Sequence, residues 1–426
     1  MSATRHSCET WSREQLEDHQ LQSLRRQLTR LADRFNGIEA GDLRTLEDLQ
    51  ELPLSSKADY QRAIAAEPPY GDLLSVPPES LVRLHFSSGT TGRPAPTGWT
   101  ADDLERWTEL YARFAFSQGV RSTDVHQCLF SYAWFVGGLG ATAAYARLGA
   151  TVIPAGSADT ERQIDTIERY GTTSIGGTPS FLLHIADAAE QLGVDLHNSS
   201  VRHVMVGGEP GGALPATRAA IEQRFGARCY DGYGCLEFQP IGWECEAQAG
   251  PHLCEDFLYA ETLDPATKRP VPAGQPGVLV LTHLDKQAFP LVRWWTGDVV
   301  VLDRSRCQCG RTHTRLPGGV RGRADDMLVI RGVNVFPAAV EELVRRQPGV
   351  GGEYRIVVER GGTDATAGQT TGLHLQVEAR ADAPDDLGQR LTRTLQTELK
   401  VKPTVEILAL GTLPRDNQKA KRVAYA

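Results

Sequence analysis

Short apolar runs alternate with helix-like stretches through the middle of this chain. Residues 150–154 and 201–206 are expected to be strands, since each is an apolar run that ends in a turn containing glycine or proline. Residues 160–170 and 214–225 have the spacing of helices. This alternation predicts an α/β fold with a doubly wound sheet, in which ligands bind at the carboxyl ends of the strands.

The chain has 426 residues, which is too long for one compact core and predicts more than one domain. After Asp325 the pattern restarts and forms a lobe of about 100 residues, a normal domain size. We expect a large N-terminal domain over residues 1–325, with a β subdomain at about 240–320, and a small mobile α+β C-terminal lobe over 326–426. Further expected elements are an amphipathic helix at 13–34, a β segment at 277–284, strands at 327–331, 354–359, 373–378 and 404–410, and helices at 338–345 and 387–399.

Composition excludes several classes of protein. The net charge of −8 argues against nucleic-acid binding, which favours a basic surface. No apolar run approaches the roughly 18 residues that a membrane span needs, and the N-terminus lacks an apolar signal core, so we expect a cytoplasmic enzyme that does not bind membranes. Eight cysteines in a chain of this size do not describe a secreted disulfide scaffold.

A loop rich in glycine and hydroxyl groups precedes the expected core. Small side chains leave its backbone N–H groups open to an approaching phosphate, although the Gly-Lys-Ser/Thr ending of a P-loop is missing. An ordinary Ser/Thr/Gly turn is an equal reading of this composition. The loop consists of Ser87, Ser88, Gly89, Thr90, Thr91 and Gly92, followed by Arg-Pro.

The full string of residues 87–94 closely resembles the phosphate-loop signature of the acyl-adenylate-forming (ANL) superfamily, in its phenylacetate–CoA ligase branch. Three later segments repeat the resemblance in order: residues 233–237, 296–298 and 322–337. A lysine near the C-terminus, Lys419, stands where the family places its C-terminal lysine.

The resemblance implies ATP and Mg²⁺ as cofactors and assigns roles to the matching residues. Glu237 would hold Mg²⁺, which takes few protein ligands, and Asp298 would accept hydrogen bonds from the ribose hydroxyls. Gly208, Glu209 and Pro210 resemble the adenine-side loop; Tyr233 and Gly234 would lie on the other face of the base. Each residue also has an ordinary structural reading. Glu237 would be a surface glutamate and Asp298 a turn cap; the Gly208 loop would be a common Gly-Gly turn and Tyr233 a core tyrosine.

The same resemblance gives catalytic roles to two cations. Arg323 would contact phosphate or ribose, and Lys419 would contact the carboxylate and the α-phosphate during adenylation. By the family pattern, the small lobe rotates about Asp325 between two half-reactions, and Gly332 then lines a tunnel for the pantetheine of CoA. Solvated surface charges are the alternative reading of Arg323 and Lys419.

Two aromatic segments resemble the family segments that line the acyl pocket, and such walls would suit a flat apolar substrate. Ordinary aromatic core packing is an equal reading of each single residue. The pocket candidates are Tyr132, Trp134, Phe135, Gly138 and Phe181.

A Cys-x-Cys pair adds a metal-site candidate in the β subdomain. Cys245, His252, Cys307 and Cys309 make a closed set of three thiolates and an imidazole for a structural Zn²⁺, and relatives look similar here. Cys254 is a substitute ligand, and free buried cysteines are the alternative.

Two departures from the family pattern predict a specialised enzyme. Leu236 replaces the usual Ser or Thr before the motif glutamate, and Trp294-Trp295 replaces a basic run before the ribose aspartate. A lost hydrogen bond to a charged group costs about 1.5–3 kcal/mol.

The expected function is ATP-dependent, AMP-forming activation of an aromatic acid, followed by thioester formation with CoA, by a homodimer. Alternatives are transfer to a carrier protein, ATP- and nitrite-dependent diazotisation of an arylamine, and a degenerate adenylate-binding sensor. Leu236 alone favours the sensor, and Glu237, Asp298 and Lys419 oppose it.

Overall fold

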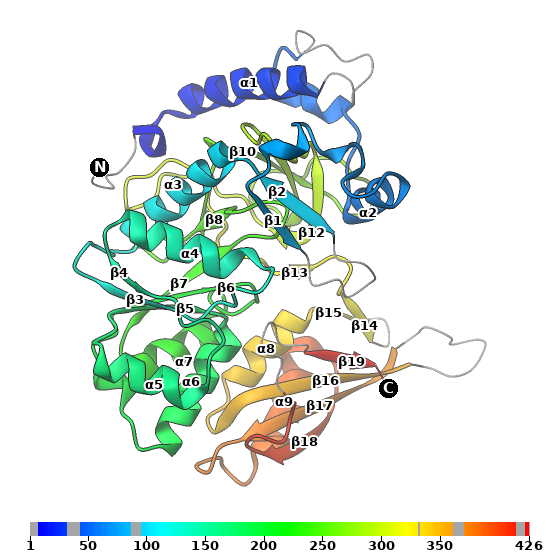
Figure 1. Cartoon of the computed structure of the whole chain (residues 1–426). Helices are drawn as coiled ribbons and strands as arrows, with labels where there is room; N and C mark the ends of the chain where they lie inside the picture. Colours follow the sequence, from blue (N-terminus) through cyan, green and yellow to red (C-terminus); the bar gives the residue numbers. More distant parts are fainter. Residues whose placement is uncertain are drawn as a thin grey trace. The chain divides into compact units, whose positions relative to one another are not determined.

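The structure is a computed structural model, and it describes residues 7–31, 43–86, 95–330, 333–360, 370–414 and 422–425. It is a mixed α/β fold, as predicted (Figure 1). The chain divides into two compact units, Met1–Gly156 with Gly232–Gly319, and Ser157–Asp231 with Val320–Ala426. Three predicted site elements lie outside the described residues: the loop 87–94, Gly332 and Lys419.

The first unit combines helices with an antiparallel sheet. Its helices are α1 (Arg13–Arg30), α2 (Lys57–Ala66), α3 (Ala101–Ser117) and α4 (Val136–Arg147), with short 3-10 turns at Ser7–Thr10, Glu47–Glu51, Gly71–Leu73 and Pro78–Ser80. Its strands are β1 (Arg83–Phe86), β2 (Pro96–Trp99), β3 (Val125–Cys128), β4 (Thr151–Ile153), β8 (Gly242–Trp243), β9 (His252–Leu253), β10 (Leu258–Leu263), β11 (Gly277–His283) and β12 (Trp294–Val300), and β7 (Arg228–Tyr233) enters it at Gly232.

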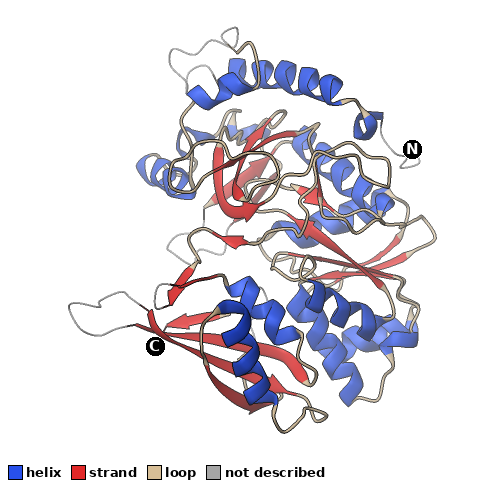
Figure 2. Ribbon diagram, turned by 180° about the vertical axis from the view of Figure 1, so that it is seen from behind, coloured by secondary structure: helices blue, strands red, loops and turns tan. Residues whose placement is uncertain are grey.

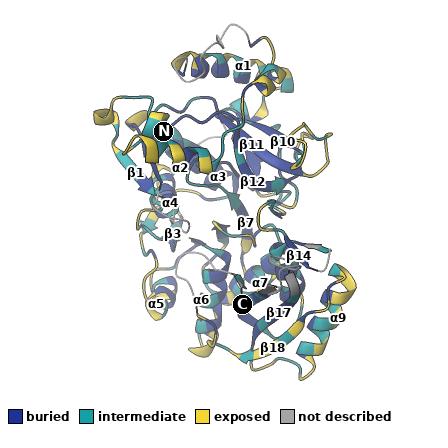
Figure 3. Cartoon of the chain, turned by 90° about the vertical axis from the view of Figure 1, so that its right-hand side faces the viewer, coloured by how far each residue is buried: buried dark blue, intermediate teal, exposed yellow. Residues whose placement is uncertain are grey.

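Strands β10, β11 and β12 lie side by side in one sheet of this unit. They pair antiparallel, with Ala260 opposite Leu281 and Val280 opposite Trp295. Every residue of β11 is buried, as the dark blue of these strands in Figure 3 shows. A strand covered on both faces reads as a continuous apolar run, which is why residues 277–284 could be predicted from the sequence.

Helix α1 confirms the predicted amphipathic helix over Arg13–Arg30. Residues 32–34 of the prediction lie outside the described residues. Its N-terminus is fixed by a capping box, in which Ser12 and Gln15 satisfy each other's backbone N–H groups. The buried leucines Leu24 and Leu28 join an apolar cluster with Leu284 and Val292.

The second unit repeats the strand–helix alternation and then adds a separate sheet. Its first part holds α5 (Thr160–Arg169), β5 (Ser174–Gly177), α6 (Pro179–Gln191), a 3-10 turn (Leu196–Asn198), β6 (His203–Gly207) and α7 (Pro215–Phe225). Its second part holds β13 (Gly322–Arg323), β14 (Leu328–Ile330), β15 (Val333–Val335), α8 (Pro337–Arg345), β16 (Val350–Arg360), β17 (Thr370–Ala379), α9 (Leu387–Leu399), β18 (Thr404–Ala409) and β19 (Val423–Tyr425). These bounds confirm the helices and strands predicted from periodicity.

The later sheet has the strand order β15-β14-β17-β16-β19, with β18 paired to β17. Helices α8 and α9 pack against it (Figure 2). Their buried side chains share one apolar cluster with the strands. Helix α8 also meets the first part of the unit, because the Ala216 N–H on α7 donates to the Glu342 carboxylate at 3.0 Å.

The two compact units do not follow the expected boundary near Asp325, since residues 157–231 cluster with the C-terminal part. The domains 1–325 and 326–426 therefore stay a prediction. In the part of the chain that the structure describes, no helix is both long and apolar enough to cross a membrane.

Breaking one buried ion pair should destabilise the first unit strongly. Arg293 donates to both Glu261 oxygens at 3.0 and 3.2 Å, and to the Gln50 and Leu52 carbonyls at 2.8 and 2.7 Å. We expect Arg293→Met to lower the free energy of unfolding by about 3–5 kcal/mol, because it leaves the Glu261 carboxylate buried without a counter-charge. Denaturant unfolding measures the loss.

The control for this prediction is Arg169→Met, which removes an exposed i,i+4 pair with Asp165. That variant should keep the wild-type midpoint, because exposed pairs contribute little. Equal midpoints for the two variants would contradict the importance of the buried pair.

Candidate functional site

The motif glutamate is buried and carries an ion pair. Glu237 follows β7 in the first unit, and its side chain is 6% exposed. The ammonium of Lys57, the first residue of α2, donates to its Oε1. A carboxylate this well buried keeps its charge only with such a partner. The ion pair therefore fixes a carboxylate at the position predicted to bind Mg²⁺.

A second carboxylate lies in the same neighbourhood. The Tyr233 hydroxyl donates to Asp298 Oδ2 at 2.5 Å, and Asp298 is buried on β12. Burial, and then the Asp298 charge, raise the pKa of Tyr233, so the phenol stays a donor. Tyr233 and Asp298, which were both predicted to contact the nucleotide, are therefore hydrogen-bonded to each other.

Both carboxylates act electrostatically on the thiol of Cys235. Burial raises the pKa of its thiol, the Glu237 and Asp298 carboxylates raise it further, and Lys57 acts in the opposite direction. Both carboxylates are therefore close enough to one thiol to act on it electrostatically. The site can present two carboxylates and one ammonium to a metal–nucleotide complex.

The aromatic segment forms the turn before α4. Phe135 is the N-cap residue of α4, and the Tyr132 hydroxyl is hydrogen-bonded to Thr142 at 2.6 Å. Gly138 is packed so closely that a Cβ there would lie 2.8 Å from the Ser131 carbonyl oxygen. A larger residue at 138 would displace the turn that carries the aromatic side chains.

Trp134 has an unusual conformation in this turn. Its φ is +52°, in the left-handed region, and 67% of the residue is exposed. Its carbonyl oxygen accepts from the Phe86 N–H at 3.0 Å and lies 3.0 Å from His85 Nδ1. Strain of this kind in a non-glycine residue needs such support and gathers at binding sites.

The adenine-side candidates belong to the second unit. Gly208 and Pro210 are exposed after β6, and Gly208 has φ +85°, which favours glycine. Glu209 accepts hydrogen bonds from the Ser180 hydroxyl at 2.9 Å and the Ser180 N–H at 3.2 Å. Phe181, next to Ser180 at the start of α6, is half-buried and packs near His184.

Arg323 and Asp325 also lie in the second unit, next to one another. Arg323 donates to Asp325 Oδ2 at 2.9 Å, and its Nε lies 3.5 Å from Asp326. Both side chains of the Arg323–Asp325 pair are substantially exposed. The Arg323 side chain is 41% exposed in this pair.

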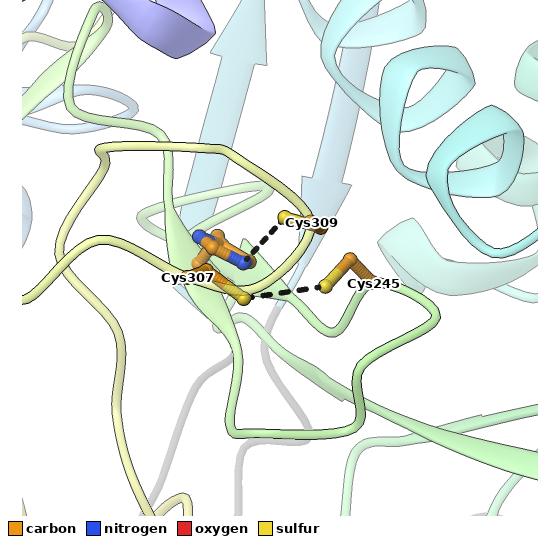
Figure 4. A group of neighbouring side chains, drawn as sticks. Cys245, Cys307 and Cys309 are labelled. Atoms are coloured by element: carbon orange, nitrogen blue, oxygen red, sulfur yellow. Dashed lines mark hydrogen bonds between the residues drawn. The ribbon is translucent and has the colours of Figure 1, made fainter.

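The four predicted metal ligands come together from three separate segments (Figure 4). Their ligand atoms all lie within 4.8 Å of one another. Cys245 Sγ is 3.9 Å from Cys307 Sγ, and Cys309 Sγ is 3.7 Å from His252 Nε2. Two sulfurs bound to one tetrahedral Zn²⁺ would be about 3.8 Å apart, whereas a disulfide needs about 2.05 Å. The set fits a tetrahedral metal, and Cys254 is not part of it.

The second nitrogen of His252 supports this orientation. Its Nδ1 is 3.3 Å from the His313 carbonyl oxygen, which can only accept, so Nδ1 carries the proton and Nε2 faces the thiols with its lone pair. A neutral imidazole in this orientation can offer Nε2 to a metal ion.

Comparison with protein-family models matches residues 13–283 to "AMP-binding enzyme" and residues 332–425 to "AMP-binding enzyme C-terminal domain". The chain belongs to the ANL superfamily of adenylate-forming enzymes. It has an N-terminal AMP-binding domain and a C-terminal domain, as the motifs predicted.

Relatives of this family member support its activity. It is 38% identical over 434 aligned residues to a phenylacetate-coenzyme A ligase of Pseudomonas putida, with 97% of this chain and 95% of the relative covered. A phenylacetate-coenzyme A ligase of Thermus thermophilus is 35% identical, with 91% and 89% covered.

Among solved structures, a 2-hydroxyisobutyryl-CoA ligase in the postadenylation state matches with a TM-score of 0.91 at 29% identity, covering 98% of this chain and 91% of that one. This ANL enzyme is accordingly an ATP-dependent, AMP-forming ligase that joins an acid to CoA.

Lys57 is the site residue that sequence reasoning missed. It pairs with a residue 180 positions away, and no motif surrounds it. The available signal was local: Ser56 and Asp59 form a capping box that starts α2 at Lys57. That pattern predicts where the helix begins, but it does not predict which carboxylate the Lys57 ammonium contacts.

A double-mutant cycle should measure the Lys57–Glu237 pair without nucleotide or metal. We expect Lys57→Met to lower the free energy of unfolding by about 1–3 kcal/mol, because the buried Glu237 carboxylate loses its partner. Adding Glu237→Gln to Lys57→Met should recover most of that loss, since the carboxylate is then gone. Denaturant unfolding in EDTA gives the four values; simple additivity would show that the two side chains do not interact.

Proposed function

We propose that the acid is aromatic, an aryl- or arylacetic acid. The main support is the 35–38% identity to proteins named phenylacetate-coenzyme A ligases over nine-tenths or more of the chain. The aromatic turn at Tyr132, Trp134 and Phe135 supports the same class, because it offers flat apolar surface. A cytoplasmic location, expected from the composition, and a homodimer are further predictions.

The reaction would proceed in two balanced steps. A carboxylate oxygen attacks the α-phosphorus of ATP, and pyrophosphate leaves. The CoA sulfur then attacks the acyl carbon, AMP leaves, and the thiol proton is released. CoA is preferred over a carrier protein or nitrite as second substrate because the named relatives are coenzyme A ligases.

We assign the described site residues to the first step. Glu237 would hold Mg²⁺, which when bound neutralises the leaving pyrophosphate. Lys57, already at this carboxylate, would then face the phosphates as a second cation. Asp298, oriented by Tyr233, would accept hydrogen bonds from the ribose.

The other roles are proposed from the motif match. Arg323 and Lys419 would contact the nucleotide and the α-phosphate. Gly208, Glu209 and Pro210 would border the adenine. The loop 87–92 would hold phosphates, Asp325 would be the hinge, and Gly332 would line the CoA tunnel.

A pyrophosphate-release screen tests the proposed function. Benzoates, phenylacetates, cinnamates and aminobenzoates are each supplied with ATP and Mg²⁺, with CoA, nitrite or neither. We expect acid-dependent pyrophosphate release and a CoA thioester as product. Nitrite-dependent AMP formation from an arylamine would indicate a diazotase, and absence of any acid-dependent release would favour a sensor.

Two variants should suppress adenylation by about 100-fold or more. Glu237→Gln removes the proposed Mg²⁺ ligand, and Lys419→Ala removes a cation at the α-phosphate. ATP–pyrophosphate exchange with the most active acid of the screen measures the loss. Glu79→Gln and Lys402→Ala change exposed residues of the same types and should retain wild-type rates. Normal exchange in Lys419→Ala would remove that residue from the catalytic set.

We also propose a structural zinc at Cys245, His252, Cys307 and Cys309. The sulfur–sulfur and sulfur–nitrogen distances fit a tetrahedral ion, and all four positions would be filled by protein. The segment after the Cys-x-Cys pair also holds the N-terminus: Arg311 donates to Glu9 at 2.7 Å, and the Thr312 N–H donates to the Glu9 carbonyl at 3.0 Å. Zinc would therefore stabilise the attachment of residues 7–11.

Replacing Cys307 and Cys309 together with Ser should remove one zinc per chain and lower the melting temperature, because structural zinc binding is coupled to folding. Elemental analysis and thermal unfolding measure both effects. Amide hydrogen exchange at residues 7–11 should accelerate at the same time. Cys229→Ser, at a buried cysteine outside the cluster, should keep the zinc. Purified wild-type protein that lacks metal would contradict the proposal.

A further inference from the structure

The motif residues 233–237 begin the short connection between β7 and β8 in the first unit. The Ile241 N–H donates to the Tyr233 carbonyl at 3.1 Å, and the Cys235 N–H donates to the Phe238 carbonyl at 3.0 Å. These two backbone bonds close the connection on itself. Its position against the rest of the unit must therefore be set by side chains that leave it.

Two of these side chains contact different elements of the first unit. Glu237 pairs with Lys57 at the start of α2. Phe238 is 1% exposed and stacks on His283 of β11, with ring centres 3.8 Å apart. Stacking of this kind resists displacement of the loop but leaves it free to slide in the plane of the rings. A directional contact is needed to remove that freedom.

Gln239 supplies a directional contact. Its Oε1 accepts from the Tyr111 hydroxyl on α3 at 2.5 Å. Tyr111 is 5% exposed, and burial raises the pKa of its phenol, so the hydroxyl stays a donor. Trp243 of β8 packs against the Tyr111 ring, with ring centres 5.4 Å apart. The hydroxyl that holds Gln239 is therefore itself held in place by packing.

The Gln239 amide also lies against the motif glycine. A Cβ added to Gly234 would lie 2.6 Å from Gln239 Nε2 and 2.8 Å from its Oε1. Real Cβ atoms do not come this close, so any side chain at 234 would push the amide away. Gln239 is thus enclosed between α3 and the backbone of the motif, two residues after Glu237.

We propose that Gln239, fixed by Tyr111, is a positioning residue for adenylation, which holds the motif loop so that the Glu237 carboxylate stays in the geometry that Mg²⁺ needs. Metal ligands work best when neighbouring groups hold them within about 0.5 Å of the binding geometry. This inference rests on the proposed role of Glu237 as the Mg²⁺ ligand.

The first test is kinetic and uses the full-length enzyme. ATP–pyrophosphate exchange with the most active acid of the screen is measured against Mg²⁺ concentration. We expect Gln239→Leu and Tyr111→Phe each to raise the Mg²⁺ concentration for half-maximal rate by about 3- to 10-fold, the effect of one lost hydrogen bond. KM for the acid should stay within about twofold. The double variant should need no more Mg²⁺ than the more affected single variant, because both changes remove the same contact.

Matched controls come from the second unit. Gln191→Leu and Tyr170→Phe change exposed residues of the same types and should match wild type. A higher KM for the acid with unchanged Mg²⁺ dependence would overturn the proposal, because Gln239 would then act on the acid. Equal loss in every kinetic parameter together with a lower melting temperature would also overturn it.

A second test needs no substrate. In EDTA and without nucleotide, Lys57→Met should lower the denaturation midpoint at least twice as much in the wild-type background as in the Gln239→Leu background, because a released loop no longer holds Glu237 against Lys57. Equal shifts in the two backgrounds would contradict the positioning role. Absence of acid-dependent exchange in the wild type would instead refute the proposed function, and the stability comparison would still decide whether Gln239 positions Glu237.

Discussion

Within each compact unit, buried ion pairs determine which distant segments lie together, because burying an unpaired charge is costly. Arg293 pairs with Glu261, and Arg422 pairs with Glu353, each across many residues of sequence and with little exposure to water. An unpaired ion in such a place would cost several kcal/mol, so each pair fixes two distant segments in one geometry. Apolar packing supplies most of the stability, but these pairs specify which segments meet.

The same constraint governs the site. The buried carboxylate of Glu237, the proposed Mg²⁺ ligand, is paired with the ammonium of Lys57. Asp298 is held in a similar way by the Tyr233 hydroxyl. In the roles proposed for them, two carboxylates held in this way would need little rearrangement when a magnesium nucleotide binds, and such preorganisation contributes strongly to catalysis.

Local patterns explain how much of the structure could be predicted. Residues 387–399 were predicted as a helix and form α9, because leucine spacing is visible in a single stretch of sequence. The four metal-site residues were predicted as a group because Cys-x-Cys is rare, and the structure brings them together. In contrast, Lys57 and Arg422 carry no local signal, since their partners are 180 and 69 residues away. The grouping of residues 157–231 with the C-terminal part depends likewise on contacts such as Ala216 with Glu342, which periodicity does not show.

The exposed Trp134 gives the enzyme an optical signal of its own. The chain has seven tryptophans, and the other six are buried or half-buried. Emission at the long-wavelength edge, and quenching by iodide, will therefore come mainly from Trp134. An aromatic acid that settles against the turn before α4 would shield this indole from water and shift its emission to shorter wavelength. With the proposed pocket at this turn, substrate occupancy would be measurable by intrinsic fluorescence, without a label and before any bond is made.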